Sequence, residues 1–376
     1  MPTPPLRVVH ITASSLIGGG PEHVWQLLQH LPQKRIESYV AAPQKQPYWD
    51  RFVESAGLGR CQSIPQRRWS LAAFVRLVHW LREQRIQIIH SHGRGAGIYG
   101  RLASLVTGVP CVHSFHGIHV PQAALPRVLY LLEERILASV SRVNVTVSPS
   151  EGRLVVNFGL QGKRLLIIPN GVEVRGGFKP SPVPSPFTIV HVSRFDDAKN
   201  SDALVPIARA MRERGILDAC RFILVGDGAG RAKLEARLAA EDLLPYFLFT
   251  GPQNGIRLFL RGAGCYLSTS LGEGLPLAVL EAQAEGVPAV VSRVPGNVDA
   301  VIADETGLLF PLDDPEAAVA CIQRIMDDAL LRERMGLAAF EHVKANYTVE
   351  RMAMIMADLY ISVSDAAGVG MESRGG

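Results

Sequence analysis

Two glutamates, Glu273 and Glu281, stand eight positions apart and form the most specific chemical pattern in the sequence. Glu273 lies between two glycines, and Pro276 behind it suits the first turn of a helix. Glu281 lies within the apolar run Leu277–Ala284, where an unpaired carboxylate would be costly to bury. Glu281 therefore needs a hydrogen-bonding partner, and the diol of a ribose offers two hydroxyls to one carboxylate.

The spacing of these glutamates separates two kinds of enzyme. The paired carboxyl groups of a glycosidase lie roughly 5–10 Å apart, whereas eight residues of helix rise by ~12 Å. The pattern favours two roles along an extended ligand, with Glu273 at a sugar and Glu281 at a nucleoside. Gly274 and Leu275, at the start of the same helix, are expected to direct amide N–H groups at ligand oxygens.

Two cations, Arg194 and Lys199, follow an apolar strand candidate and lie five positions apart. Arginine supplies a planar fork of donors and lysine a point charge, which together suit a diphosphate. A second interpretation has equal weight, in which these cations pair with Asp196, Asp197 or Asp202. No Asp-x-Asp motif follows a strand, and two cations already answer the charge of a diphosphate, so no metal is predicted. No other cofactor is expected.

Glycines mark two further loops. Gly18, Gly19 and Gly20 follow the first strand candidate, where backbone amides are able to approach a phosphate at the start of a helix. The alternative is that a tight turn needs glycine for steric reasons alone. Gly226 begins a Gly-Asp-Gly sequence after a later strand candidate, without the glycine spacing of a dinucleotide-binding fingerprint.

Histidines occupy similar positions in the first half of the chain. His92, His116 and His119 each follow a strand candidate, at the edge where open α/β sheets bind ligands. A histidine at such a position is more often a local hydrogen-bonding residue than a catalyst. From the residues alone, either role is open for His116.

Apolar, β-branched runs alternate with amphipathic segments of helical length, which predicts parallel sheets covered by helices on both faces. A segment rich in glycine and proline interrupts this rhythm and separates two such arrays. The predicted organisation is a first domain at 1–175, a linker at 176–186, a second domain at 187–346, a C-terminal helix at 347–364 that returns to the first domain, and a disordered tail at 365–376. Strands are expected at 6–11, 38–42, 86–90, 111–115, 143–147, 187–192, 222–225, 246–250, 265–268 and 289–292.

The charge of the chain is unevenly distributed. Residues 1–180 carry 21 Lys and Arg against 9 Asp and Glu, whereas residues 181–376 carry 18 against 26. A basic half indicates either an anionic partner or a solvated basic face. The five cysteines are scattered, with no metal-ligand spacing, and neither a signal peptide nor a membrane span is evident, which predicts a cytoplasmic protein.

The motifs in this order resemble the retaining glycosyltransferases of the GT-B fold known as family 4, across nearly the whole chain. The resemblance rests on Gly18-Gly19-Gly20-Pro21-Glu22, Pro169-Asn170-Gly171-Val172, Ser193-Arg194-Phe195 with Lys199, Gly226-Asp227-Gly228, and the E-x7-E pattern from Glu273 to Glu281. It implies an α/β protein of two Rossmann-like domains that face each other across a deep interdomain cleft. The family commonly has Gly-Arg where this chain has Ser193-Arg194.

The resemblance also implies roles for particular residues. Arg194 and Lys199 would neutralise the donor diphosphate, Glu281 would hold the ribose, and Glu273 with the amides of Gly274 and Leu275 would contact the sugar. It further implies that Gly18, Gly19 and Gly226 approach the donor phosphates and nucleotide, that Gln253 lies near the base, and that His116 lies near the donor sugar. Arg194, Lys199, Glu273 and His116 are the expected catalytic residues.

The implied reaction moves a hexose from a UDP or GDP sugar to a glycan or lipid-linked acceptor in the synthesis of cell-surface polysaccharide, without a metal and with retention. The basic first domain would bind the acceptor. Its segment Gln66–Arg82 is either a sheet-covering helix with Leu71, Phe74, Val78 and Leu81 in the core or a contact for the inner face of the cytoplasmic membrane.

Two other classes share parts of this pattern. A nucleotide-sugar epimerase or a phosphorylase of the same fold would carry a denser set of acid and base residues or a cofactor site, and an epimerase would convert the donor without an acceptor. A non-catalytic binder of nucleotide sugars or nucleic acid is the other, although recognised nucleic-acid motifs are absent and no nucleic-acid partner is expected.

Overall fold

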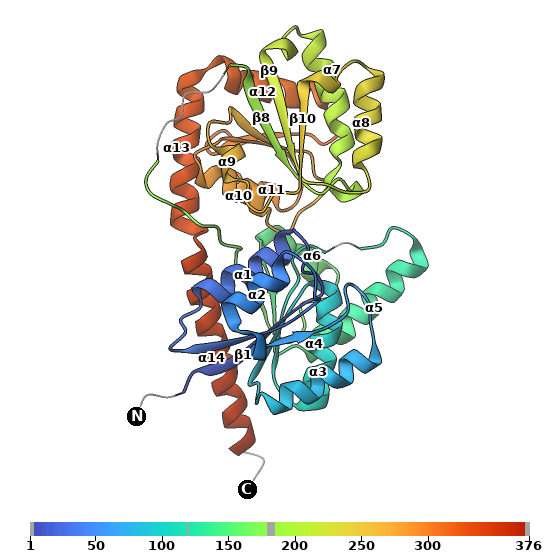
Figure 1. Cartoon of the computed structure of the whole chain (residues 1–376), viewed down its shortest axis with the longest axis vertical. Helices are drawn as coiled ribbons and strands as arrows, with labels where there is room; N and C mark the ends of the chain where they lie inside the picture. Colours follow the sequence, from blue (N-terminus) through green and yellow to red (C-terminus); the bar gives the residue numbers. More distant parts are fainter. Residues whose placement is uncertain (1–3, 119, 179–184, 373–376) are drawn as a thin grey trace. The chain divides into compact units, whose positions relative to one another are not determined.

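The computed structural model describes residues 4–118, 120–178 and 185–372, and it divides into two compact units. The first unit combines the chain up to Gly171 with the chain from Val349 onward, and the second is Val172–Thr348. Each unit contains one parallel sheet between helices (Figure 1). The prediction of two Rossmann-like α/β domains is therefore confirmed.

The first unit is built on a seven-stranded sheet in the order β3-β2-β1-β4-β5-β6-β7. The order changes direction between β1 and β4, and ligands of such sheets bind outside the carboxyl ends of strands at this point. Its strands are β1 Leu6–Thr12, β2 Ile36–Ala42, β3 Cys61–Ser63, β4 Ile88–His92, β5 Cys111–Ser114, β6 Val143–Thr146 and β7 Leu165–Ile167. Its helices are α1 Gly19–His30, α2 Tyr48–Ala56, α3 Leu71–Glu83, α4 Gly93–Thr107, α5 Ala124–Val140, α6 Pro149–Asn157 and α14 Val349–Glu372.

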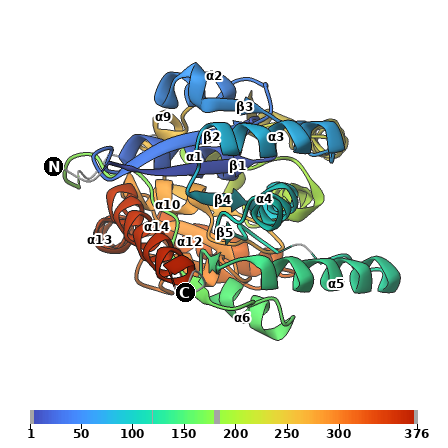
Figure 2. The same cartoon turned by 90° about the horizontal axis from the view of Figure 1, so that it is seen from below.

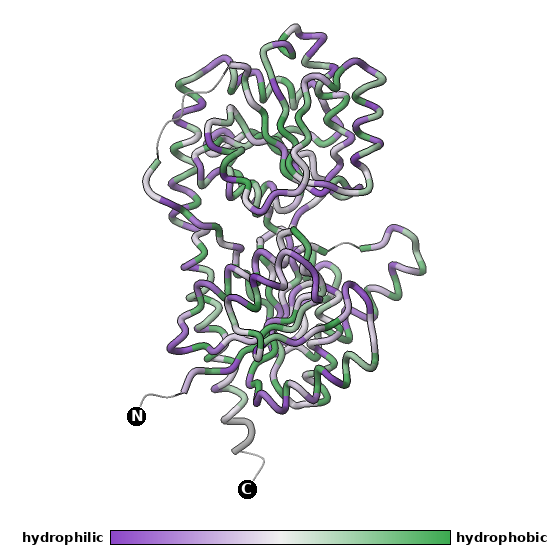
Figure 3. Tube along the Cα trace, in the orientation of Figure 1, coloured by the Kyte–Doolittle hydropathy of each residue, from purple (hydrophilic) through white to green (hydrophobic). Residues whose placement is uncertain are grey.

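The second unit has a six-stranded sheet in the order β10-β9-β8-β11-β12-β13, which changes direction between β8 and β11. Its strands are β8 Phe187–Val192, β9 Cys220–Val225, β10 Phe247–Gly251, β11 Cys265–Ser268, β12 Ala289–Ser292 and β13 Gly307–Phe310. Its helices are α7 Leu204–Glu213, α8 Arg231–Ala240, α9 Arg257–Leu260, α10 Leu277–Ala284, α11 Asn297–Ala300, α12 Pro315–Asp327 and α13 Ala329–Asn346. Figure 3 shows hydrophobic segments running through both units.

The C-terminal helix α14 completes the core of the first unit. Its side chains Met352, Met356 and Tyr360 are buried in one apolar cluster with Val8 of β1 and Ile88 of β4. α14 also packs along α1, and Asp358 of α14 forms an ion pair of 2.7 Å with Arg35, which directly precedes β2. The sheet is thus covered on this face by helices from both ends of the sequence (Figures 1 and 2).

Two expectations about boundaries are wrong, and a third cannot be compared. The helix α14 continues to Glu372, so the predicted disordered tail from 365 is incorrect for residues 365–372. The first unit ends at Gly171 instead of 175, because Val172 already pairs with Thr348 of the second unit. Part of the predicted linker, 179–184, lies outside the described residues, as does His119.

The segment Gln66–Arg82 is a helix only from Leu71, where the Ser70 hydroxyl accepts a hydrogen bond from the Ala73 amide. Such a cap satisfies one of the free amides at a helix start. The expected core position of Leu71 is wrong, since its side chain is 67% exposed; Val78 and Leu81 are buried as expected. Within the described residues, no helix is long and apolar enough to cross a membrane.

Candidate active site

The second unit brings Lys199 and Glu273 together at the carboxyl ends of β8 and β11. The Lys199 Nζ atom lies 2.5 Å from the Glu273 Oε1 atom, and the Ser270 hydroxyl donates to the same oxygen at 2.7 Å. Both charged side chains are largely buried, with 24% and 13% of their surface exposed. Neither interpretation of the sequence contained this pair, since Lys199 was expected to contact a diphosphate or one of three aspartates.

The backbone fixes this pair from both sides. The Leu271 amide donates to the Ala198 carbonyl at 2.9 Å, and the Thr269 hydroxyl donates to the Lys199 carbonyl at 3.1 Å. The Asp196 side chain accepts a hydrogen bond from the Lys199 amide and so caps the short turn that carries the lysine. The two loops therefore form one connected structure at the point where the strand order reverses.

Arg194 lies nearby in sequence but is more exposed. Its guanidinium forms an ion pair of 3.0 Å with Asp196, and 48% of the arginine side chain remains accessible. Asp202 is paired with Lys233 and Arg237 instead of with either predicted cation. The local ion-pair interpretation thus applies to Arg194, whereas Lys199 pairs with a glutamate distant in sequence.

Gly226 has a steric reason to be glycine. A Cβ atom at this position would lie 1.9 Å from the Ser193 carbonyl oxygen, and the φ angle of +131° is one that other residues rarely adopt. Gly228 is in a similar position, with Phe195 backbone atoms 2.6–2.9 Å from its hypothetical Cβ. The Gly-Asp-Gly sequence therefore lets the loop after β9 pack directly against the loop that carries Arg194.

Gly296 is a supporting residue that sequence reasoning missed. A Cβ atom there would lie 2.6 Å from both the Cβ and the carbonyl oxygen of Glu273, and its φ angle is +82°. The Glu273 amide donates to the Pro295 carbonyl at 3.0 Å. Close packing of the loop after β12 thus holds Glu273 in place. The residues Pro295 and Gly296 predict a turn in this loop, but the sequence does not indicate which residues the turn contacts.

Glu281 lies on α10 and is partly buried. Burial first, and then the charges of Glu273 and Glu281, raise the pKa of the Tyr266 hydroxyl. This hydroxyl donates to the Val192 carbonyl at 3.2 Å, at the end of β8. Tyr266 therefore lies within electrostatic range of both glutamates, which share one region of the second unit.

The other predicted residues of this unit are placed as follows. Gly274 and Leu275 are buried and precede the first helical residue, Leu277. The Gln253 side chain donates to the Thr250 carbonyl at 2.9 Å, a local contact within the loop after β10. Their ligand contacts stay predictions.

In the first unit, the glycine loop leads directly into α1, which begins at Gly19 with Pro21 in its first turn as expected. A Cβ atom at Gly18 or Gly20 would have no described atom within 4 Å, and the φ angle of Gly18 is the extended 161°. Packing of the described residues therefore does not require glycine at either position. The purely steric interpretation of these two glycines is disfavoured.

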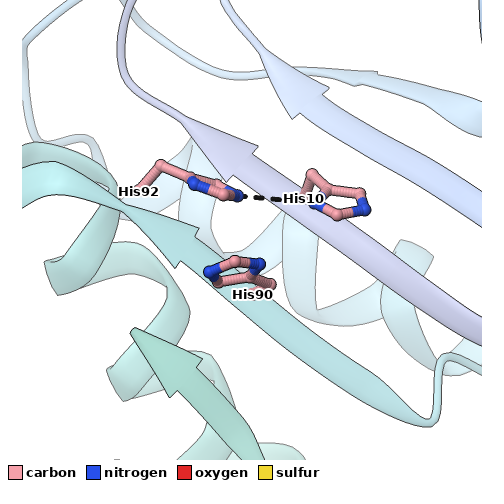
Figure 4. Close-up of side chains that lie close together, drawn as sticks. All are labelled: His10, His90 and His92. Carbon is pink, nitrogen blue, oxygen red and sulfur yellow. Dashed lines mark hydrogen bonds between the residues drawn. The ribbon is translucent and has the colours of Figure 1, made fainter. Parts of the chain in front are cut away.

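A cluster of histidines lies beside this helix start, and we call it the histidine cluster: His10, His23, His90, His92 and His116. The first four are buried and His116 is partly buried. His10 Nδ1 lies 3.4 Å from His92 Nε2, and His92 Nδ1 lies 3.2 Å from His116 Nε2 (Figure 4 shows the first of these contacts). The rings of His23 and His116 pack edge to face, 4.5 Å between centroids.

The sheet explains why these side chains meet. His10 of β1 is the register partner of His90 of β4, and His92 lies two positions further along the same face. His90 Nδ1 lies 2.6 Å from the Tyr360 hydroxyl of α14, and its Nε2 lies 2.9 Å from the Ser114 hydroxyl. Histidines at 90 and 92 alternate as side chains on one face of a strand do, so the sequence indicated that these two lie together. The contact of His90 with Tyr360 of α14 could not be predicted from spacing.

Burial keeps this cluster uncharged. It lowers the pKa of His10 to about 3 and that of His116 to about 4. Burial, with smaller contributions from neighbouring histidines, also holds the pKa values of His23, His90 and His92 well below 6.5. At neutral pH the cluster therefore consists of neutral imidazoles, each able to donate one hydrogen bond and accept another.

Neutral imidazoles are also metal ligands, and two sets of three have ring nitrogens within 4.8 Å of one another: His10, His90 and His92, and His23, His92 and His116. His90 and His92, however, already use both ring nitrogens in hydrogen bonds. A metal would have to displace one of these bonds. The geometry favours a hydrogen-bonded network over a metal centre.

The loop that carries His116 is held by Glu151, a second residue that sequence reasoning missed. His116 adopts a left-handed φ angle of 58°, and the Gly117 amide donates to Glu151 Oε1. The Val147 amide donates to the other carboxylate oxygen at 2.8 Å. Burial raises the pKa of Glu151 to about 6, although both amides oppose the shift. Glu151 thus joins the loops after β5 and β6.

Comparisons with known proteins agree with this architecture. Residues 17–175 match the family model described as Glycosyltransferase Family 4, and residues 178–342 match the model described as Glycosyl transferases group 1. Among solved structures, HepE from Anabaena in complex with UDP and glucose is similar, with a TM-score of 0.82 and 17% identity over 95% of this chain and 100% of HepE. Sucrose-phosphate synthase from Thermosynechococcus elongatus has a TM-score of 0.79 and 20% identity, over 96% and 100%.

Two curated relatives are similar in sequence. An Escherichia coli UDP-Gal:alpha-D-GlcNAc-diphosphoundecaprenol alpha-1,3-galactosyltransferase is 25% identical over 95% of this chain and 97% of its own length. A D-inositol 3-phosphate glycosyltransferase from Acidothermus cellulolyticus is 30% identical over 77% of this chain and 71% of its own length. The two family models follow one another along the chain, one over most of each unit. The chain therefore belongs to family 4 of the glycosyltransferases and has the GT-B fold.

Proposed function

We propose that this glycosyltransferase transfers a hexose from a UDP or GDP sugar to a glycan or lipid-linked acceptor, with retention at the anomeric carbon, in the synthesis of cell-surface polysaccharide. The Lys199–Glu273 pair carries this proposal, because it holds a cation and a carboxylate together where the strand order of the second unit reverses. A donor that binds there presents its diphosphate to the cation and its sugar hydroxyls to the carboxylate.

The two cations of this site, Lys199 and Arg194, are held in different ways. Lys199 is preorganised by Glu273, whereas Arg194 is half exposed and free to exchange Asp196 for a phosphate oxygen. Fixed cations stabilise the charge that develops on a leaving diphosphate. Glu281 then binds the ribose from a position whose charge, like that of Glu273, acts on the buried Tyr266 hydroxyl.

The bonds exchanged in the proposed reaction all lie on one face of the sugar. The bond between the anomeric carbon and the diphosphate oxygen breaks, and a bond to the acceptor oxygen forms. The acceptor hydroxyl gives its proton to an oxygen of the departing phosphate, and the nucleoside diphosphate leaves. No protein nucleophile is needed, and we propose that Arg194 and Lys199 neutralise the diphosphate in place of a metal.

The first unit is proposed to contribute the glycine loop and His116. Gly18 and Gly20 are unconstrained by their described neighbours, which is consistent with close approach of a phosphate to the start of α1. His116 is neutral and is oriented by His92, so it is able to hydrogen-bond a sugar hydroxyl without carrying charge. His92 acts here as a positioning residue.

The relatives support the choice of donor and acceptor classes. The E. coli relative is named for UDP-Gal and for an acceptor linked to diphosphoundecaprenol, and HepE was solved with UDP and glucose. A lipid-linked diphosphate acceptor also suits the basic first half of the chain. We accordingly propose that the enzyme works at the inner face of the cytoplasmic membrane.

A thermal-shift screen against UDP, GDP, ADP and their sugar conjugates tests the donor site, since a ligand that binds the folded state raises its apparent stability. The expected result is stabilisation by one nucleotide class, reduced in Arg194→Ala and Glu281→Ala. If no nucleotide shifts the wild type, the proposed donor site is rejected. If the enzyme converts the sugar of its donor without any acceptor, it is an epimerase and the transferase reaction is rejected.

Two further measurements test the mechanism. Proton NMR of the product reports the anomeric configuration, and a product of the same configuration as the donor is expected. Activity after dialysis against EDTA is expected to equal that of the untreated enzyme. Inversion of configuration, or loss of activity that a divalent metal restores, contradicts the corresponding part of the proposal.

A further inference from the structure

The helix α5 presents a stripe of large apolar side chains on its outer face. Their exposed fractions range from 55% to 69%, which is high for leucine, isoleucine and valine. With 3.6 residues per turn these side chains fall within an arc of about 100°. We call them the α5 stripe: Leu125, Val128, Leu129, Leu132 and Ile136.

The opposite face of α5 is firmly attached to the first unit. Tyr130, Glu134, Leu137 and Ala138 are its buried residues. Glu134 forms an ion pair of 2.8 Å with Arg101 of α4, and both side chains are almost completely inaccessible. The orientation of the helix is therefore fixed by its inner face, and the outward direction of the α5 stripe follows from it.

The beginning of α5 extends beyond the body of the first unit. Every residue from 122 to 129 is exposed, so the first turns of the helix have no buried side chain. Figures 1 and 2 both show α5 at the margin of this unit, reaching outward from the sheet. An apolar stripe on such a projecting helix is a feature of proteins that bind another surface.

The charges around the α5 stripe are positive. Glu133 is paired with Arg94 at 2.7 Å, and Glu134 is the buried partner of Arg101, so both acids of the helix are neutralised. Arg127 and Arg135 are exposed and form no ion pair with a described residue, although Arg135 donates to the Phe158 carbonyl. Arg135 borders the α5 stripe, whereas Arg127 lies on the other side of the helix, with its guanidinium 5.7 Å from the centre of the Phe158 ring. An apolar stripe with a basic edge, in a half of the chain that carries 21 Lys and Arg against 9 Asp and Glu, complements the interface of an anionic bilayer.

We infer that the α5 stripe docks this enzyme on an anionic lipid bilayer. The inference rests on the proposed function in one respect, since a membrane-embedded acceptor gives the docking its purpose. A second copy of the chain is a less suitable occupant, because the stripe belongs to the basic half of the chain, and two copies would bring like charges together. An interfacial helix needs only an apolar face with a basic edge.

The experiment compares three forms of the full chain: the wild type, Leu129→Gln/Leu132→Gln in the α5 stripe, and Leu258→Gln/Leu330→Gln as the matched control. Leu258 and Leu330 are 79% and 81% exposed on the second unit. Each form is floated with phosphatidylcholine vesicles, with and without about 30% phosphatidylglycerol. Analytical ultracentrifugation of the same samples reports the oligomeric state.

The wild type and the control are expected to bind the anionic vesicles, less strongly at high salt, and the stripe variant to bind them about 30-fold more weakly. Absence of wild-type binding overturns the inference, as does equal binding of the stripe variant. The inference is also overturned if the wild type and the control are dimers and the stripe variant is a monomer, because the α5 stripe is then an interface between two copies of the chain. Nucleotide thermal shifts on the same proteins are independent of vesicles, so they report separately on the proposed function.

Discussion

Lys199 Nζ and Glu273 Oε1 lie 2.5 Å apart although 74 positions separate the two residues in the sequence. The pair connects the loops after β8 and β11, the two strands at which the order of the second sheet reverses. Each side chain has a partner of opposite charge in a largely buried position, so replacement of either one leaves the other uncompensated.

Replacement of Lys199 by alanine is expected to lower kcat by about 100-fold, because a fixed cation at the departing diphosphate contributes to transition-state stabilisation. The measurement is the release of nucleoside diphosphate from the donor at saturating concentration. Lys233→Ala is the control, since Lys233 also pairs with a carboxylate but is 68% exposed on the surface of the same unit. A loss below threefold in Lys199→Ala, or equal losses in both variants, contradicts the assigned role.

Gly226→Ala is expected to destabilise the second unit by roughly 3 kcal/mol or more, because the new methyl group collides with the Ser193 carbonyl at an unfavourable φ angle. Urea unfolding measures the change. Gly255→Ala is the matched control, as a Cβ atom there would meet no described atom within 4 Å. Similar stability in the two variants would show that the loops after β8 and β9 do not pack as described.

The stability of the fold is expected to depend on pH through the histidine cluster. The pKa of His10 is about 3 in the folded state and 6.5 when it is exposed, so below pH 6.5 only the unfolded state takes up this proton. The stabilisation is complete above pH 6.5 and is lost by about 1.4 kcal/mol per pH unit as the pH falls toward 3. Glu151 has the opposite effect on stability between pH 4.5 and 6. Burial raises its pKa to about 6, so in this range the folded state binds the proton more tightly than the unfolded state, and the folded state gains stability as the pH falls.

Urea unfolding at pH 6.5, 5.5 and 4.5 tests this dependence with His10→Gln, which removes one titrating group. Its slope of stability against pH is expected to be smaller than that of the wild type by about 1.4 kcal/mol per unit. His79→Gln, on the exposed face of α3, is the control and should leave the slope unchanged. Identical slopes in the wild type and His10→Gln would refute the buried, neutral state of His10.

Arg101→Met is expected to destabilise the first unit by about 3–5 kcal/mol, because it leaves the buried carboxylate of Glu134 without its cation. The double variant Arg101→Met/Glu134→Leu should recover most of this loss, since an apolar pair needs no desolvation of charge. Denaturant unfolding of both variants forms the test. If the double variant is as unstable as the single one, the pair contributes through its shape instead of its charge.

The sequence predicted the central strands of both sheets but not β3, β7 and β13. Each of these lies at an edge of its sheet and spans only three or four residues. A strand in the centre of a parallel sheet is apolar on both faces, which gives a clear signal. β3 and β7 have no fully buried residue, so only pairing in the folded chain identifies them, whereas β13 is apolar and mostly buried and was missed despite this signal.

The candidate site, like the sheets, could be predicted only in part. Glu273, Glu281, Arg194 and Lys199 were identified by residue type and loop position, and the structure places them around the ends of β8 and β11. The Lys199–Glu273 pair was not predicted, because the sequence offered three nearer aspartates and no measure of which loops touch. Contacts that depend on backbone packing, such as that of Gly296 with Glu273, have no local signature.

The return of α14 to the first unit has a consequence for the order of events at the ribosome. The core around Val8 and Ile88 stays open until Met352, Met356 and Tyr360 have been synthesised. The second unit is continuous in sequence and has all of its strands before that point. The domain that is translated second is therefore the first to have its complete sequence. The core of the earlier domain stays incomplete until translation has passed α14.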